Sequence, residues 1–238
     1  MSSAIRKGVP FCLCLLLWVL IAAFDSSAAE RNVTTLEGKH VVGYQGWFSC
    51  PGDTSGLGWG HWFRSASPSA SSLAIDMWPD TSGFDQDELC PTPLRLPSGA
   101  PANLFSSENP KTVARHFRWL RDYGIDAVAL QRFESGMTKP AVMIRANNVL
   151  RNVQGAATAT GRGFFIMYDL TGADSDVAER LEEDWIRLTR DAKITDSPAY
   201  VQHNGKPVVG LWGIGFADRS ITIVNPRTSL NFSKPTRQ

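Results

Sequence analysis

The stretch GYQGWFSCPGDTSGLGWGHWF, residues 43–63, places aromatic side chains among glycines at the end of a strand-like run. Flat aromatic faces supply apolar contact, glycine lets a ligand approach the backbone, and nearby polar side chains can fix hydroxyl groups. This composition is typical of a carbohydrate cleft. The alternative is that Trp47 and Trp62 fill the core at one end of the fold.

Other polar and aromatic side chains follow the later strand-like runs. In α/β folds with parallel strands, ligands bind at the carboxyl ends of the strands, so the residues at those ends are binding candidates. The candidates are Gln45 and Trp47 after the first run, Gln131, Arg132 and Glu134 after the second, Tyr168 and Asp169 after the third, and Trp212 after the fourth. Because glycoside hydrolysis needs two carboxyl groups about 5–10 Å apart, Asp169 and Glu134 are the candidates for acid–base or nucleophile roles.

Strand-like and helix-like runs alternate between these residues. Short β-branched and aromatic runs predict strands at 40–48, 125–133 and 163–170, and an Asn204-Gly205 hairpin turn leads into a fourth apolar strand. Apolar residues at intervals of three and four predict the helices. The first helix begins at Pro110 behind the cap Asn109 and stops at Gly124, the second runs from Pro140 to Gly161, and the third starts beside Asp174 and Asp176, with Val177, Leu181, Trp185 and Leu188 on one face.

This alternation, with nearly continuous apolar strands, predicts an α/β fold with a parallel sheet. A (β/α)8 barrel and an open doubly wound sheet both satisfy it. No G-x-G-x-x-G pattern follows the first strand, which disfavours a nucleotide-binding open sheet. We therefore expect a fold of the (β/α)8 TIM-barrel type, with about the first four β/α units present.

The N-terminal segment predicts export. Arg6 and Lys7 precede an apolar run that ends in small residues, which is the pattern of a secretory signal peptide at residues 1–29. The run is too short for a stable membrane span, although an uncleaved anchor is the alternative. Cleavage leaves Cys50 and Cys90, for which an oxidising compartment favours a disulfide over two free thiols or a metal site.

Charge and composition limit the classes of ligand and cofactor that the protein is expected to bind. The formal net charge is +1, so nucleic acid is not an expected ligand. No metal ligand set and no cofactor motif is identified, and Asp85, Asp87 and Glu88 are interpreted as a solvated acidic loop rather than a calcium site. Asn32 and Asn231 begin glycosylation sequons. We expect a secreted protein, periplasmic if the source is bacterial, with an oligosaccharide or polysaccharide ligand.

The ordered motifs GYQGWF…GWGHW, LFSSENPKTVARHFRWLRDYGID, a strand ending LQRF and another ending MYDL resemble the bacterial and fungal glycoside hydrolase families 71 and 99-like, relatives of endo-acting mannosidases and α-glucanases. The resemblance covers about residues 40–219. It implies a secreted (β/α)8 barrel that acts on a polysaccharide or glycan. It also implies that Asp169 contacts the substrate and that the sugar subsites are lined by Tyr44, Trp47, His61 and Trp62.

The sequence departs from those families in its second half. The E-W-x-E-like stretch that supplies their catalytic glutamates is absent, and the pattern is lost after GIGFADR. The interpretation is a truncated hydrolase with a signal peptide at 1–29, the first part of a barrel at 30–219 and a divergent tail at 220–238. Three functions stay open: a glycosidase that uses Asp169 and Glu134, a catalytically inactive sugar-binding remnant, and a non-functional gene fragment.

Overall fold

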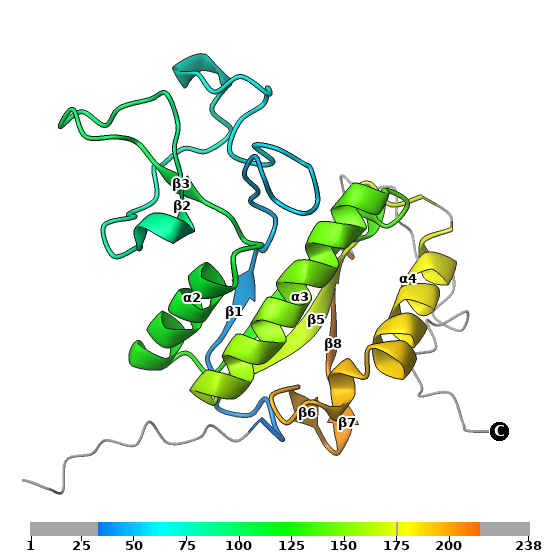
Figure 1. Ribbon diagram of the computed structural model, residues 1–238. Helices are drawn as coiled ribbons and strands as arrows, with labels where there is room; N and C mark the ends of the chain where they lie inside the picture. The colour runs from blue at the N-terminus through cyan, green and yellow to red at the C-terminus, as the bar shows by residue number, and fades with distance from the viewer. Residues whose placement is uncertain (1–32, 175, 215–238) are drawn as a thin grey trace, which may run out of the picture.

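The computed structural model describes residues 33–174 and 176–214 of the chain. A parallel sheet of four strands in the order β1-β4-β5-β8 forms its centre (Figure 1). The strands are β1 (Val41–Tyr44), β4 (Ala127–Phe133), β5 (Gly163–Asp169) and β8 (Val209–Trp212), and the helices that accompany them are α2 (Pro110–Asp122), α3 (Pro140–Thr160) and α4 (Val177–Ile186). The α/β fold class is thereby confirmed.

The strand order bears on the choice between the two candidate folds. Strands neighbouring in the chain are neighbours in the sheet, with no reversal of the order as in a doubly wound fold. Right-handed connections between such strands place their helices on one face. Tyr44, Arg132 and Tyr168, which share a face by register, accordingly contact His116 of α2, Asn147 of α3 and Asp184 of α4. This arrangement is compatible with the first part of a (β/α) barrel, and the barrel itself, with its closure into eight strands, stays a prediction.

Local sequence signals set the ends of the helices. The Asn109 side chain accepts hydrogen bonds from the backbone nitrogens of Lys111 and Thr112, and Pro110 occupies the first turn of α2, as predicted. Helix α3 ends where Gly161 adopts a φ of 65°, a left-handed conformation that glycine adopts without strain. Asn204 and Gly205 both have positive φ in the predicted hairpin, which joins β6 (Gln202–His203) to β7 (Lys206–Pro207).

The largest difference from the predicted strand boundaries lies at the end of the first strand. The strand expected over 40–48 ends at Tyr44, because the chain turns at Gly46 against helix α3. A Cβ on Gly46 would lie 2.4 Å from Cγ1 of Val149, so only glycine fits at this approach. Residues 45–48 therefore form a loop over the end of the sheet.

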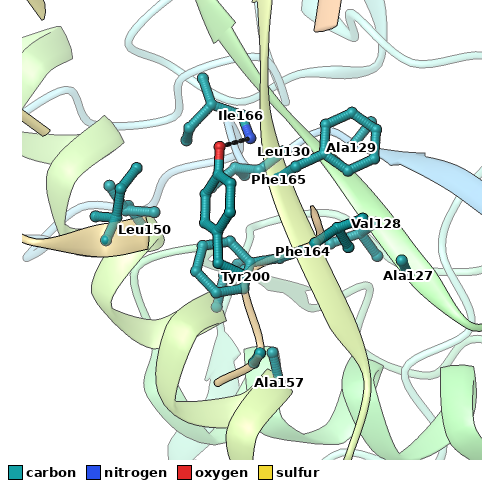
Figure 2. Packing of buried hydrophobic residues seen from close by; sticks show 14 of the residues in the cluster. Ala127, Val128, Ala129, Leu130, Leu150, Ala157, Phe164, Phe165, Ile166 and Tyr200 are labelled. Atoms are coloured by element: carbon teal, nitrogen blue, oxygen red, sulfur yellow. Dashed lines mark hydrogen bonds between the residues drawn. The ribbon is translucent and has the colours of Figure 1, made fainter. Parts of the chain in front are cut away.

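The main core lies between the sheet and the helices. Tyr200 stands within it, and its hydroxyl accepts a hydrogen bond from the Ile166 nitrogen at 3.3 Å (Figure 2) and donates one to the Val208 carbonyl at 2.8 Å. The hydroxyl thus joins β5 to the chain that enters β8. No helix in the described part of the chain is long and apolar enough to cross a bilayer.

A second, smaller core lies beyond the carboxyl end of β1, in the cyan and green region of Figure 1. It is built on Trp62, Phe63 and Leu104, beside the antiparallel pair β2 (Leu89–Cys90) and β3 (Leu104–Phe105). The predicted Cys50–Cys90 disulfide is present, with Cα atoms 6.3 Å apart. We call residues 47–107 the aromatic unit.

Short helical turns complete the described structure: 3-10 helices at Ala70–Ser72, Gln86–Glu88, Glu134–Gly136 and Ile194–Asp196, and a π-helical turn at Arg187–Asp191 that extends α4. The predicted signal peptide, the sequon residues Asn32 and Asn231 and the tail at 220–238 lie outside the described residues.

Candidate functional site

The last row of the sheet combines a carboxylate with aromatic side chains. Phe133, Asp169 and Trp212 are register partners at the carboxyl ends of β4, β5 and β8. The Trp47 ring lies 4.9 Å from the Phe133 ring, so it extends the row toward β1. Trp212 is 48% exposed, which makes this end of the sheet accessible to a ligand.

Asp169 is held rigidly within that row. One carboxylate oxygen accepts a hydrogen bond from the Gln131 amide, and the other accepts one from the Thr171 nitrogen at 2.8 Å. Asp169 is 3% exposed, whereas Gln131 is half-buried. Since the carboxylate binds one amide hydrogen of Gln131, it fixes the orientation of a side chain that can donate and accept hydrogen bonds.

Trp47 and His61 form a stacked pair at the neighbouring edge. Their ring centroids are 5.1 Å apart and their planes differ by 18°. His61 adopts a φ of 64°, an uncommon conformation for a residue with a side chain. His61 is an exposed residue, yet partial burial of its ring and the charge of Arg145 lower the pKa of His61 to about 4. The imidazole is therefore neutral at physiological pH.

Trp62 is a core residue. It is 2% exposed, its ring stacks on Phe48 with centroids 4.0 Å apart, and its indole nitrogen donates a hydrogen bond to the Phe105 carbonyl at 2.8 Å. This burial favours the core alternative for Trp62, and its role as a sugar platform stays a prediction. Most of the aromatic residues in the stretch 43–63 build the second core, and Trp47 and His61 remain at its border with the sheet.

Three other candidates lie on the opposite face of the sheet. The Tyr44 hydroxyl lies 2.9 Å from Nδ1 of His116. Arg132 and Tyr168 are buried, and both donate hydrogen bonds to the Asp184 carboxylate. Side chains alternate between the two faces of a strand, so Gln131 and Asp169 cannot share a face with Arg132 and Tyr168. Of the consecutive candidates at the strand ends, only alternate residues lie on the face that carries Asp169 and Gln131.

Glu134 lies in the 3-10 turn after β4. It is 1% exposed and forms an ion pair with Arg180 of α4, which also pairs with Asp174 at 2.5 Å. Its carboxylate thus ties α4 to the end of β4. Gln45, in contrast, is exposed in the loop after β1. The roles of Asp169 and Glu134 as a catalytic pair stay a prediction.

The acidic loop at Asp85, Asp87 and Glu88 is ion-paired with α2. Lys111 lies 2.8 Å from both aspartates, and Arg115 lies 2.5 Å from Glu88. The carboxylate oxygens are within 4.8 Å of one another, close enough to hold a metal ion. However, Glu88 is buried rather than solvated as expected, and it is already neutralised by Arg115. The loop therefore serves to anchor the aromatic unit.

The sequence did not identify Arg145 and Asp184 as candidates, although each bonds to residues near the carboxyl ends of the strands, on opposite faces of the sheet. Arg145 donates to the Trp47 carbonyl at 2.7 Å, and Asp184 accepts from Arg132 and Tyr168. Each lies in the apolar stripe of its helix, four residues before Val149 and Leu188 respectively. A charged residue inside such a stripe is the signal that could have identified them.

No protein-family model and no curated protein sequence matches this chain. Two solved structures similar to it are of a GH99 endo-alpha-mannosidase from Bacteroides thetaiotaomicron. The structure in complex with bis-tris-propane has 15% sequence identity and a TM-score of 0.48 over 72% of this chain and 41% of that chain. The other has 17% identity and a TM-score of 0.45 over 72% of this chain and 44% of that chain. This chain thus spans less than half the length of either one.

Proposed function

We propose that the chain binds an oligosaccharide at the carboxyl ends of β4, β5 and β8. The observation that supports this proposal is the row in which Asp169, bonded to Gln131, lies between Phe133 and Trp212. Two strand spacings, roughly 10 Å, separate β4 from β8. A ligand with apolar faces and edge hydroxyls could lie along this row.

The chemistry of these residues favours a neutral, hydroxylated ligand. Aromatic rings provide contact area for the apolar faces of a sugar, and the Gln131 amide and neutral His61 imidazole provide hydrogen-bond donors and acceptors for its hydroxyls. The motifs shared with glycoside hydrolase families 71 and 99-like suggest the same ligand class. An exported protein, as residues 1–29 predict, would meet such glycans outside the cell.

We infer binding without efficient hydrolysis. The Glu134 carboxylate is engaged by Arg180, and both oxygens of Asp169 accept hydrogen bonds. A general acid must hold a proton and deliver it to the leaving oxygen. Glu134 is 1% exposed within its ion pair and Asp169 is 3% exposed, so neither presents an open carboxyl group to a leaving oxygen.

The function is tested by screening the 238-residue chain against α-linked mannose and glucose oligosaccharides. We expect saturable binding by calorimetry and no more than trace release of reducing ends. Asp169→Asn should weaken binding, because it disturbs the orientation of Gln131. Robust turnover that Asp169→Asn abolishes would establish a hydrolase and contradict the binding-only proposal, and absence of binding to every oligosaccharide would contradict both.

Replacement of Trp47 should separate ligand contact from stability. Trp47→Ala is expected to weaken oligosaccharide binding by about 1–3 kcal/mol through loss of apolar contact. Trp119→Ala is the matched control, since Trp119 is a partly exposed tryptophan on α2 and should leave the affinity unchanged. Equal affinities for Trp47→Ala and the wild type would remove Trp47 from the site.

A further inference from the structure

Arg145 is a buried cation that connects helix α3 to the aromatic unit. It is 7% exposed, and one guanidinium nitrogen donates to the Trp47 carbonyl at 2.7 Å and to Ser49 Oγ at 3.4 Å. Burying a guanidinium carries a large desolvation cost. The hydrogen bonds to the Trp47 carbonyl and Ser49 offset part of that cost.

The segment that Arg145 contacts is the neck of a loop. The Ser49 nitrogen donates a hydrogen bond to the Gly60 carbonyl at 3.1 Å, so residues 49 and 60 close the loop that lies between Trp47 and His61. A Cβ on Gly60 would lie 2.5 Å from Ser49 Oγ and 3.3 Å from Nη1 of Arg145. The absence of a side chain at Gly60 leaves the space in which the guanidinium reaches the neck.

We propose that Arg145 is the positioning residue of the oligosaccharide site. By fixing the loop neck to α3, Arg145 holds Trp47 and His61 in their stacked arrangement. This inference rests on the proposed function only for the identity of the ligand. The stacked pair itself, 5.1 Å between centroids, exists in the protein without a ligand. Its dependence on Arg145 can therefore be measured separately.

The charged groups around Arg145 leave its donors available for the neck. Asp53 accepts hydrogen bonds from the Cys50 nitrogen at 2.6 Å and from the Ser106 hydroxyl at 2.7 Å. Glu108 accepts from the Ser55 hydroxyl and from the Asn148 amide. Both carboxylates act on the guanidinium electrostatically without a direct ion pair to it in the described structure, while its positive charge opposes protonation of His61.

Titration of His61 tests the inference without a ligand. The chain has four histidines, and the resonance lost in His61→Gln identifies the one to follow by NMR. In the wild type we expect a pKa of about 4, and in Arg145→Met a shift toward the ordinary value of 6.5, with loss of the ring-current shift from Trp47. An unchanged His61 pKa together with an unchanged ring-current shift in Arg145→Met would overturn the proposal. Where Arg145→Met does not fold, the wild-type ring-current shift of His61 still tests the stacked pair, and its absence would overturn the proposal.

Oligosaccharide affinity then tests whether the stacked arrangement of Trp47 and His61 matters for ligand binding. Arg145→Met should lower oligosaccharide affinity roughly tenfold, equivalent to one charge-assisted hydrogen bond, and Arg145→Lys should retain the low His61 pKa and part of the affinity. Arg151→Met, at an exposed position of α3, is the matched control. Wild-type affinity in Arg145→Met would contradict the positioning role. A wild type that binds no oligosaccharide would contradict the proposed function instead, and the titration would still decide whether Arg145 holds the pair.

Discussion

Asp184→Asn should destabilise the protein by about 3–5 kcal/mol, because it leaves the buried guanidinium of Arg132 without its counter-charge. Asp184 accepts hydrogen bonds from two nitrogens of Arg132, at 2.6 and 2.8 Å, and from the Tyr168 hydroxyl at 3.0 Å. All three side chains are buried between β4, β5 and α4. Urea unfolding, followed by far-UV circular dichroism, measures the change in free energy.

Two further variants distinguish the buried pair from ordinary surface charge. Asp191→Asn removes the partner of Arg190 at an exposed position and should cost less than about 1 kcal/mol. Replacing the cluster together, as Arg132→Met, Tyr168→Phe and Asp184→Leu, should recover most of the stability, since no buried polar group then lacks a partner. A cost for Asp184→Asn as small as that for Asp191→Asn would show that Arg132 finds another partner.

The pH dependence of this pair has a defined sign. Burial raises the pKa of Asp184, but the hydrogen bonds and charge of Arg132 outweigh it and hold the pKa below its ordinary value. The unfolded chain therefore binds the proton more readily than the folded one near pH 4. Stability from Asp184 is complete above the ordinary pKa of 3.8 and is lost as pH falls through the lower folded value. The difference between wild type and Asp184→Asn should shrink over that range.

Burial of His116 also makes the stability of the fold decrease as the pH falls, but over a higher pH range than Asp184 does. Burial lowers the pKa of His116 to about 4, against 6.5 for an unburied imidazole. Because the unfolded state takes up this proton first, stability from the neutral ring is full above pH 6.5 and declines as the pH falls toward 4. His116 packs against Phe105 and contacts the Tyr44 hydroxyl, so it lies on the face of α2 that packs against the rest of the protein.

The sequence predicted the elements whose determinants are local. Asn109, Pro110 and Gly161 act within one turn of their own helices, and their positions therefore indicate where α2 and α3 begin or end. The end of β1 depends instead on the approach of Gly46 to Val149, a contact across more than 100 residues. No local pattern in residues 45–48 predicts that contact.

The site was only partly predictable for the same reason. Asp169, Gln131 and Trp212 follow from the rule that ligands bind at strand ends, and the structure brings them together. Arg132 and Tyr168 satisfied the same rule but lie on the other face, because the rule does not fix the phase of the alternation. Trp62 could not be distinguished from Trp47 by residue type, since burial depends on which neighbours the folded loop supplies.

The Cys50–Cys90 disulfide should contribute about 4 kcal/mol to the stability of the aromatic unit, from the loop entropy that it removes from the unfolded chain. The two cysteines are 40 residues apart in sequence. The second core is small, so it depends on this link more than the main core does. Cys50→Ser with Cys90→Ser should therefore lower the midpoint of urea unfolding of the aromatic unit, while β4 and β5 keep their structure.

Hydrogen exchange measured by amide NMR locates the effect. Faster exchange is expected at the backbone of β3 and at Trp62, whose amide bonds to the Trp59 carbonyl at 3.2 Å, and unchanged protection is expected at Leu130 and Ile166 in the sheet. Because Trp47 and His61 belong to the loop that the disulfide anchors, oligosaccharide affinity should fall in the same variant. Uniform acceleration across both cores would mean that they unfold as one cooperative unit, and retained protection in β3 would mean that the ion pairs of Lys111 and Arg115 anchor the aromatic unit without the disulfide.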